Sequence, residues 1–357
     1  MSYETSLAYA PSNIAFIKYM GKADQANNIP SNPSLSFTLN DLCSYVEVRK
    51  VKNMKTGVSF VKELPNINVI NNAAQLYRPQ LSNVEIKRFT HHIDKVKEKS
   101  LDVLESFHLG HESEGFLEIR SANTFPLGAG IASSASSFAA LTLSLVYTFC
   151  SNKEKFLKVY ENDLNFRNLI AQISRLGSGS SCRSFFGPWV KWVGEDVFPV
   201  KHDFPNLAHF VLLVNKDPKK VSSSQAHQLV KTSPFYQTRL LNMPEKLKQI
   251  EDYLKAGDIK NVSAVAWAEF MEMHSLFHTS NQSFSYWKPE TLEVLSWIHP
   301  SVGVDQSSPI VTMDAGANIH FFIRNEMKEL FKEKLQRQFN RFEILEDSTG
   351  LGAKIIC

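Results

Sequence analysis

Apolar and polar residues alternate in some segments of this 357-residue chain and follow helical spacing in others. Residues 13–20 and 115–123 are rich in β-branched, aromatic or alternating apolar residues, a pattern that predicts strands. Residues 82–104 carry charges at helical spacing behind the cap-like Ser82, which predicts a solvated helix. The run 136–150 is apolar on nearly every side and predicts a central, buried helix.

The second half of the chain mixes the same two patterns. Amphipathic helices interrupted near Gly257 are predicted over 242–279, and residues 308–325 predict a strand, a tight turn and a strand. The length favours one large unit or two domains. Charge, proline and turn residues gather over 193–206, so we expect an N-terminal domain over 1–195 and a C-terminal domain over 196–357.

Composition narrows the class of protein. The net charge of +3 is small for this length and argues against a nucleic-acid binder that works by bulk charge. The cysteines Cys43, Cys150, Cys182 and Cys357 are too scattered for a zinc site. The first residues lack the pattern of a signal peptide, and no apolar stretch approaches the roughly 18 residues of a membrane span. We therefore expect a cytoplasmic protein that does not bind membranes.

Small residues concentrate between a predicted strand and the buried helix, in the segment NTFPLGAGIASSASSF over 123–138. Free N–H groups at a helix start, glycines that permit close approach and serine hydroxyls together suit a phosphate. The segment is neither a Walker A nor a GxGxxG sequence. A phosphate cradle and a tight turn onto a closely packed helix both remain open. The residues concerned are Gly128, Gly130, Ser133, Ser134, Ser136 and Ser137.

A second small-residue cluster, GSGSSCRSFFG over 177–187, places Ser178, Ser180, Ser181 and Arg183 in one short loop. Arginine suits bidentate contact with a phosphate or a carboxylate. The cluster is not a GxSxG elbow, which disfavours a serine hydrolase. A glycine-serine helix end with a solvated arginine is the alternative interpretation.

Three further charged residues complete a possible site. Lys18 and Lys22 stand four apart, and in one strand their ammonium groups would face the same side and converge on an anion. Asp314 lies between an apolar run and Ala-Gly, where it is expected at a strand end beside a tight turn. Ordinary surface lysines and a turn-forming aspartate are the alternatives. Together, these features are the components of a phosphoryl-transfer site.

Several longer segments then follow one another in a specific order. They are APSNIAFIKYMGKAD, IPSNPSLSFTL, NTFPLGAGIASSASSFAAL, RLGSGSSCRSFFGPWVKW, VSSSQAHQL, FMEMHSLFHTS and MDAGAN. This series resembles the mevalonate diphosphate decarboxylases of the GHMP kinase superfamily, in register across nearly the whole chain. The resemblance implies an α+β GHMP kinase fold in two lobes, an N-terminal lobe like ribosomal protein S5 domain 2 and an α/β C-terminal lobe, with the active site between them.

The resemblance also implies a reaction. Enzymes of this family use ATP and Mg²⁺ to phosphorylate the tertiary 3-hydroxyl of mevalonate 5-diphosphate. They then release phosphate and carbon dioxide together to give isopentenyl diphosphate. Family members are commonly homodimers, so a homodimer with a small-molecule substrate is expected.

Residue roles follow by position from the same resemblance. Asp314 corresponds to the catalytic carboxylate beside the hydroxyl, and Lys18 to the lysine near the transferred phosphoryl group. Arg183 corresponds to the arginine that holds the substrate carboxylate, and Asn13 to its neighbour. The substrate-contacting positions, mostly around the diphosphate, are Tyr19, Lys22, Arg88, Ser178, Ser180 and Ser224. The ATP-phosphate positions are Pro126, Gly128, Ala129, Gly130, Ser133 and Ser134, and Ser134 is also a candidate Mg²⁺ ligand.

The chain departs from the family pattern at a few positions. Met20 replaces a usual tryptophan, Ala23 a common arginine, Gly128 an alanine and Ala317 a proline. These departures leave room for a related kinase or decarboxylase that acts on mevalonate or its 5-phosphate. A catalytically silent member of the fold is a third hypothesis, and retention of both Asp314 and Lys18 argues against it.

Overall fold

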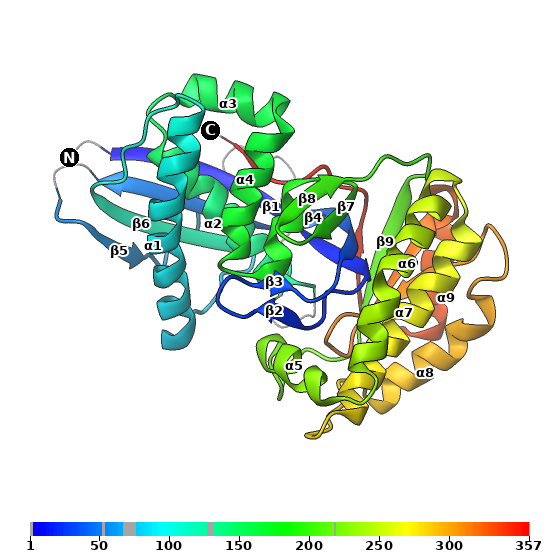
Figure 1. Cartoon of the computed structure of the whole chain (residues 1–357). Coiled ribbons are helices and arrows are strands. Elements are labelled where there is room, and N and C mark those ends of the chain that lie inside the picture. Colours follow the sequence, from blue (N-terminus) through cyan, green and yellow to red (C-terminus); the bar gives the residue numbers. More distant parts are fainter. Residues whose placement is uncertain (1–2, 52–53, 67–75, 127–130, 218, 357) are drawn as a thin grey trace.

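The computed structural model of the chain describes residues 3–51, 54–66, 76–126, 131–217 and 219–356. Its first half is built on one sheet of seven strands: β1 (Tyr3–Ile17), β4 (Ser34–Val51), β5 (Gly57–Phe60), β6 (Phe116–Asn123), β7 (Trp189–Val193), β8 (Asp196–Pro199) and β13 (Lys354–Ile355). The strand order is β13-β1-β4-β6-β5, with β7 pairing with β4 and with β8 (Figure 1). A small pair, β2 (Lys22–Asp24) and β3 (Ile29–Pro30), stands apart.

Helices cover this sheet: α1 (Asn83–Ser106), α2 (Ser133–Phe149), α3 (Lys153–Asn162) and α4 (Leu164–Arg175), followed by the 3-10 helix η1 (Gly179–Phe185). Helix α2 packs on β1 and β4 and is buried along nearly its whole length, which confirms the predicted central helix. Helix α1 begins as predicted, because Ser82 and Glu85 form a reciprocal capping box.

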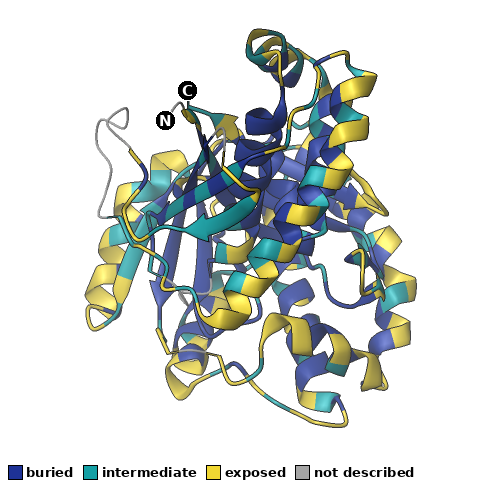
Figure 2. Ribbon diagram, turned by 90° about the vertical axis from the view of Figure 1, so that its left-hand side faces the viewer, coloured by how far each residue is buried: buried dark blue, intermediate teal, exposed yellow. Residues whose placement is uncertain are grey.

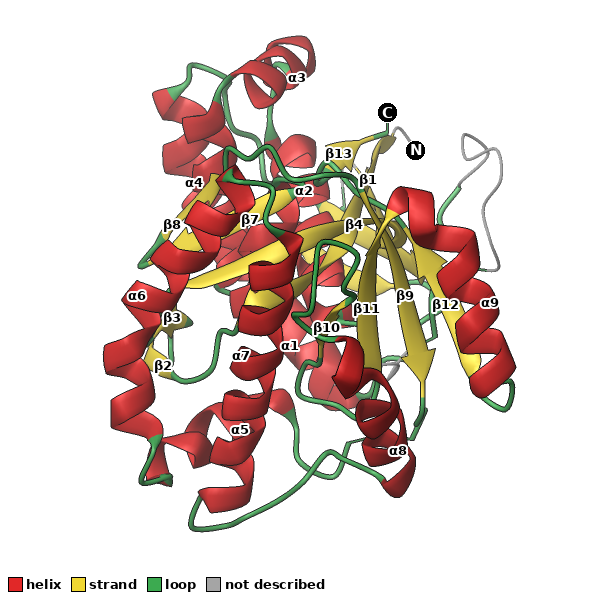
Figure 3. Cartoon of the chain, turned by 90° about the vertical axis from the view of Figure 1, so that its right-hand side faces the viewer, coloured by secondary structure: helices red, strands yellow, loops and turns green. Residues whose placement is uncertain are grey.

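The second half holds a four-stranded antiparallel sheet in the order β10-β11-β9-β12 (Figure 3). Its strands are β9 (Leu207–Leu213), β10 (Ile310–Thr312), β11 (Ile319–Arg324) and β12 (Glu343–Asp347). Its helices are α5 (Ser223–Leu229), α6 (Tyr236–Lys255), α7 (Ile259–Thr279), α8 (Pro289–Ile298) and α9 (Lys328–Gln338), with short 3-10 turns η2 (Val230–Thr232), η3 (His299–Ser301) and η4 (Asn325–Met327). The predicted break near Gly257 is confirmed, since this glycine has φ +63° between α6 and α7.

The two halves share a core. The ring of Phe16 on β1 lies 4.9 Å from that of Phe322 on β11 and 4.9 Å from that of Trp189 on β7. The end of the chain also returns to the first half, where β13 pairs with β1. Buried residues line the inner faces of sheets and helices, and exposed residues lie on the outer helix faces (Figure 2). The predicted division at 195/196 stays a prediction.

One predicted strand is wrong at both ends. The strand expected over 13–20 is β1, which starts at Tyr3 and ends at Ile17. The first half of β1 was not predicted because small and apolar residues alternate before Asn13. At the other end of β1, the chain leaves the sheet before Lys18. In the described part of the chain, no helix is both long and apolar enough to cross a bilayer.

Candidate active site

A cleft opens between the two halves where β1 and β10 end. Both halves contribute its walls, so the position agrees with the expected site between two lobes. The predicted residues that line it are Asn13, Lys18, Tyr19, Lys22, Arg88, Ser134, Ser178, Ser180, Arg183, Ser224 and Asp314. Lys219, Ser222, His227 and Met273 also line the cleft, although sequence reasoning gave them no role.

Lys18 and Asp314 form an ion pair at the base of the cleft. Lys18 directly follows β1 and Asp314 follows β10 by two residues, and Lys18 Nζ lies 2.8 Å from Asp314 Oδ1. Asp314 occupies the predicted tight turn, since the N–H of Gly316 donates to its carbonyl at 2.7 Å. Burial raises the pKa of Asp314, but the Lys18 ammonium together with His320 and Arg183 outweighs burial, and the pKa lies below its usual value. Asp314 is therefore an ionised carboxylate.

Arg183 on η1 lies in the same cleft with neutral partners. Its Nε donates to Asn13 Oδ1 at 3.0 Å and its Nη1 donates to Ser34 Oγ at 2.8 Å. Asn13 is itself oriented, because its amide donates to Ser184 Oγ at 2.9 Å. Among the described residues, Arg183 forms no ion pair, although its side chain is buried. Its charge is thus available to an anionic ligand.

Lys18 and Lys22 line the same cleft, as expected, but the strand geometry from which this was predicted is wrong. The two lysines do not share a strand, because β1 ends at Ile17 and Gly21, with φ +94°, redirects the chain. Lys22 instead begins β2, and its Nζ donates to Asn28 Oδ1 at 2.6 Å. Both lysines reach the cleft through this turn.

The wall next to Lys22 is polar and cationic. Burial and the nearby Arg88 guanidinium lower the pKa of Lys22 to about 8. Arg88 lies over the ring of Phe138 and donates to the carbonyl of Gly177 at 2.7 Å. The hydroxyl of Tyr19 is buried and has no hydrogen-bond partner among the residues that the structure describes. This wall has the groups to receive an anion of high charge.

The N-terminus of α2 faces the same cleft. Its N-cap residue, Ala132, has φ +50° and supplies no capping side chain. The N–H of Ala135 donates to the carbonyl of Ala132 at 2.7 Å, and the N–H groups of Ser133 and Ser134 before it are placed to receive another acceptor. Ser134 is exposed there, and Ser178 Oγ donates to Ser134 Oγ at 3.3 Å, which joins the two small-residue clusters. Ser136 instead faces the core and bonds to Ser44 Oγ at 2.7 Å. Gly128, Ala129 and Gly130 lie outside the described residues, and the described Pro126 precedes them.

A largely apolar cavity opens beside Ser133 and Ser134. Val46, Phe60, Phe89 and other residues of β4, β5, β6, α1 and α2 line it. Arg88 and Ser134 line both this cavity and the main cleft, so the two spaces adjoin.

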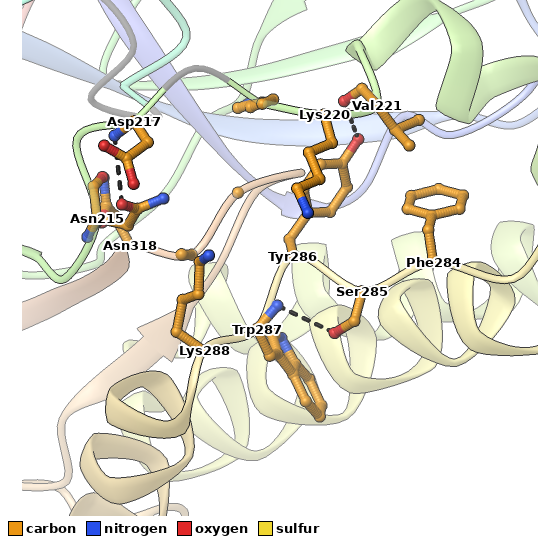
Figure 4. Close-up of a pocket in the computed structure, with 13 residues that line it drawn as sticks. Asn215, Asp217, Lys220, Val221, Phe284, Ser285, Tyr286, Trp287, Lys288 and Asn318 are labelled. Carbon is orange, nitrogen blue, oxygen red and sulfur yellow. Dashed lines mark hydrogen bonds between the residues drawn. The ribbon is translucent and has the colours of Figure 1, made fainter.

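Another pocket lies behind the turn that carries Asp314 (Figure 4). Gly316, Ala317 and Asn318 of that turn line it, and Lys219 lines both this pocket and the cleft. Tyr286 closes one side, donating its hydroxyl proton to the carbonyl of Val221 at 2.9 Å. Residues of this turn thus line a second pocket as well as the cleft.

Sequence reasoning missed several groups that hold the site. Ser34 bonds Arg183, and Asn28 bonds Lys22. The imidazole of His227 accepts the N–H of Gly21 at 2.9 Å. Ser34 and His227 lie in the motifs that carried the family resemblance. Their place in these motifs is the feature of the sequence that could have identified them as site residues.

The fold and the cleft define a two-lobed phosphoryl-transfer enzyme. Residues 10–197 match the family described as the diphosphomevalonate decarboxylase-like N-terminal domain, and residues 209–352 match the mevalonate 5-diphosphate decarboxylase C-terminal domain. The chain belongs to the diphosphomevalonate decarboxylase family, so the predicted family and its ATP-dependent decarboxylation are confirmed.

Individual relatives agree with this assignment. The diphosphomevalonate decarboxylase of Saccharomyces cerevisiae is 31% identical over 92% of this chain and 80% of its own length. A crystal structure of a mevalonate diphosphate decarboxylase from Legionella pneumophila has 35% identity and a TM-score of 0.75, covering 96% of this chain and 100% of that one. The Staphylococcus aureus enzyme has 26% identity and a TM-score of 0.78, covering 100% and 99%. These similarities confirm the predicted α+β fold in two lobes.

One further neighbour, with a TM-score of 0.78 and 24% identity over 99% of both chains, holds MVAPP, AMPPCP and magnesium in its structure. At that identity the likeness shows a common fold.

Proposed function

We propose that the cleft converts mevalonate 5-diphosphate to isopentenyl diphosphate, with ATP as phosphoryl donor and Mg²⁺ as its counter-ion. One observation carries the assignment: the Lys18–Asp314 pair, at 2.8 Å, lies in one cleft with Arg183, a buried arginine that has only neutral partners. The Lys18–Asp314 pair suits phosphoryl transfer to a hydroxyl. Arg183 suits binding of the substrate carboxylate that is later lost as carbon dioxide.

Asp314 acts as the base in the first step. A tertiary alcohol is far too weak an acid to ionise alone, so an ionised carboxylate accepts its proton as the new O–P bond forms. The bond between the terminal phosphorus and the ADP oxygen breaks, and its electron pair stays with ADP. Lys18 keeps Asp314 ionised and, once the proton moves, directs its positive charge to the transferred phosphoryl group.

Arg183 and Asn13 hold the substrate carboxylate for the second step. The bond between carbon and the phosphate oxygen breaks with its electron pair on phosphate, and positive charge develops on that carbon. The carbon–carbon bond to the carboxylate then supplies the electron pair of the new double bond, and carbon dioxide leaves. Because Arg183 is fixed by Asn13 and Ser34, it aligns the carboxylate, which is a positioning effect.

The diphosphate of the substrate fits the polar wall. We assign this group to Lys22 and Arg88, together with the unpartnered hydroxyl of Tyr19. Further contacts with the diphosphate are assigned to the hydroxyls of Ser178, Ser180 and Ser224.

The nucleotide fits beside α2. Its phosphates would meet the N-terminus of α2 at Ser133 and Ser134, and its base would enter the adjoining apolar cavity. By their positions in the sequence, Pro126, Gly128, Ala129 and Gly130 are also assigned to the ATP phosphates. In the described part of the chain, no three carboxylate, histidine or cysteine side chains gather as a metal site. This fits Mg²⁺, which takes few protein ligands besides phosphate oxygens and water, and Ser134 is its candidate ligand. When bound, Mg²⁺ neutralises charge on the transferred phosphate.

We also propose that the protein is a cytoplasmic homodimer whose lobes divide at 195/196. The family resemblance supports the dimer, and sedimentation velocity tests it directly: a species of the monomer mass of 40.4 kDa at micromolar concentration would reject it.

A product assay tests the proposed reaction. The protein is incubated with ATP and Mg²⁺ and, separately, with mevalonate, mevalonate 5-phosphate or mevalonate 5-diphosphate. We expect ADP, phosphate, carbon dioxide and isopentenyl diphosphate in equal amounts from the diphosphate alone. A stable phosphorylated product without carbon dioxide would instead establish a kinase, and decarboxylation of the monophosphate would move the substrate assignment.

A further inference from the structure

The main chain of Lys18 is held by three side chains, two of which belong to the second half of the protein. Lys18 follows the end of β1, so the sheet no longer pairs its N–H and C=O groups. Its N–H donates to Glu269 Oε1 on α7 at 3.0 Å. Its carbonyl accepts from Arg239 Nη2 on α6 at 3.3 Å and from Asn32 Nδ2 at 2.8 Å. The residue is therefore fixed through both of its main-chain polar groups.

Glu269 is an ionised acceptor that α6 holds in place. Its side chain is fully buried, and Arg239, also buried, donates to Oε1 at 2.5 Å and to Oε2 at 3.2 Å. Burial raises the pKa of Glu269, but the Arg239 guanidinium together with Lys246 and the N–H of Lys18 outweighs burial and lowers the pKa below its usual value. A buried charge pair is expensive to assemble and gains little stability over an apolar pair. Its placement against Lys18 points to a role in the site.

The same helix holds the main chain of Asp314. His274, five residues after Glu269 on α7, donates from Nε2 to the carbonyl of Asp314 at 3.1 Å, and since a carbonyl only accepts, the proton is assigned to Nε2. Burial lowers the pKa of His274 to about 3, so the ring is neutral. The ring stacks on Trp287, with centroids 5.1 Å apart, which fixes its orientation. Trp287 is one of the residues around the pocket behind the Asp314 turn (Figure 4).

Helix α7 lies against both β1 and β10, whose ends carry Lys18 and Asp314. We propose that α7 aligns the Lys18–Asp314 pair across the two halves of the protein, with Glu269 fixing the main chain of Lys18 and His274 fixing that of Asp314. Both are positioning residues, since neither touches the reacting atoms. The proposal rests on the roles proposed above for Lys18 and Asp314.

The alignment has a kinetic consequence. Lys18 and Asp314 lie on separate halves of the chain, so a small shift of either strand end changes their 2.8 Å contact. A displacement of about 1 Å in a catalytic group can cost roughly 10²-fold in rate. Loss of an α7 contact should therefore lower kcat and leave substrate binding, which the other cleft residues perform, nearly unchanged.

Glu269→Gln is the main test, and Glu272→Gln is its matched control. Both glutamates lie on α7 and bond to Arg239 and Lys246, but only Glu269 bonds to Lys18. We expect Glu269→Gln to lower kcat roughly 10- to 100-fold with KM for mevalonate 5-diphosphate within about threefold. Glu272→Gln, which alters the same ion cluster, should keep kcat within about twofold.

The pH profile supplies a readout that a purely structural role would not change. Glu269 counteracts the lowering by burial of the Lys18 pKa, so without its charge the pKa of Lys18 falls further. Lys18 acts as an ammonium, and activity is lost as pH rises through its pKa. The alkaline limb of kcat should thus move to lower pH in Glu269→Gln and stay in place in Glu272→Gln. The charged and titratable groups around Lys18, Asp314 and Glu269 are Arg183, Arg239, Lys246, Glu272, Lys219 and His320.

His274 is tested with two substitutions of opposite design. His274→Phe keeps a ring against Trp287 but loses the donor to Asp314, and His274→Gln restores an N–H near the position of Nε2. We expect kcat to fall roughly tenfold in the Phe variant and to recover in the Gln variant, with the alkaline limb unmoved in both.

The outcomes separate this proposal from the proposed function. Equal kcat and an unmoved alkaline limb in Glu269→Gln and Glu272→Gln would overturn the role of α7. Should Glu269→Gln not fold, Glu269→Asp keeps the charge near Arg239 and withdraws the carboxylate from Lys18, so full kcat in that variant would overturn it equally. Near-normal turnover in Lys18→Met would reject the catalytic assignment itself.

Discussion

Two of the buried cations of the cleft, Lys18 and Arg183, have opposite surroundings. Lys18 contacts a carboxylate that belongs to the other half of the chain, whereas Arg183 contacts an amide and a hydroxyl of its own half. Lys18 is thus neutralised before any ligand arrives, and Arg183 keeps a charge that a ligand must satisfy. The difference agrees with the proposed roles, in which Lys18 takes part in the chemistry and Arg183 binds the substrate carboxylate. In that proposal the chemistry lies at the junction of the halves and the carboxylate contact lies on the first half.

Removing the carboxylate of Asp314, the partner of Lys18, should have the largest effect on turnover. Asp314→Asn keeps the shape of the side chain but cannot accept the hydroxyl proton, so we expect kcat to fall roughly 10³- to 10⁴-fold. The Kd of mevalonate 5-diphosphate, measured by calorimetry without ATP, should stay within about threefold of the wild-type value. Near-normal turnover in Asp314→Asn would remove this residue from the role of base.

Much of this comparison could be predicted from the sequence. Asp314 at a turn after an apolar run and Arg183 in a small-residue loop both carry local signals, and the structure brings them into one cleft. Likewise, Ser82 and Glu85 fix the start of α1 through neighbouring residues alone. Local chemistry of this kind is legible along the chain because the partners stand within one turn of each other.

The partners of the two cations were not predictable in the same way. Ser34 meets Arg183 because η1 packs against β4, and Glu269 meets Lys18 because a helix of the second half packs on a strand end of the first. Helical spacing around Glu269 predicts an amphipathic helix and does not indicate which strand it covers. The assumed strand geometry of Lys18 and Lys22 also failed, since Gly21 turns the chain between them.

Removing Arg183, the cation with an amide and a hydroxyl as partners, should affect substrate binding more than the rate of the chemical step. Charged hydrogen bonds are worth about 1.5–3 kcal/mol, so Arg183→Met should weaken binding of mevalonate 5-diphosphate roughly 10- to 150-fold, with the KM of ATP nearly unchanged. Calorimetry and steady-state kinetics measure both. An unchanged substrate Kd would contradict the assignment of Arg183 to the substrate carboxylate.

The thermal stability of the free protein tests the same comparison between Lys18 and Arg183. Arg183→Met removes a buried charge with neutral partners and should leave Tm equal or higher. Lys18→Met leaves the Asp314 carboxylate without its cation and should lower Tm, and adding Asp314→Asn should restore it. Equal losses of Tm in Arg183→Met and Lys18→Met would remove the distinction between the two cations.

Lys22 offers the test with the smallest expected effect. Its ammonium pairs with no carboxylate among the described residues, and its charge depends on pH. Burial and Arg88 lower its pKa to about 8 in the free protein, so its ammonium is present below pH 8 and is lost above it. The KM for mevalonate 5-diphosphate should therefore begin to rise near pH 8, at most about tenfold per pH unit. Lys22→Arg should abolish the rise, because a guanidinium stays charged, and Lys22→Met should raise KM at every pH. A wild-type KM that stays flat to pH 9.5 would show that Lys22 does not hold the diphosphate as a charge, and would leave Arg88 as the cation that does.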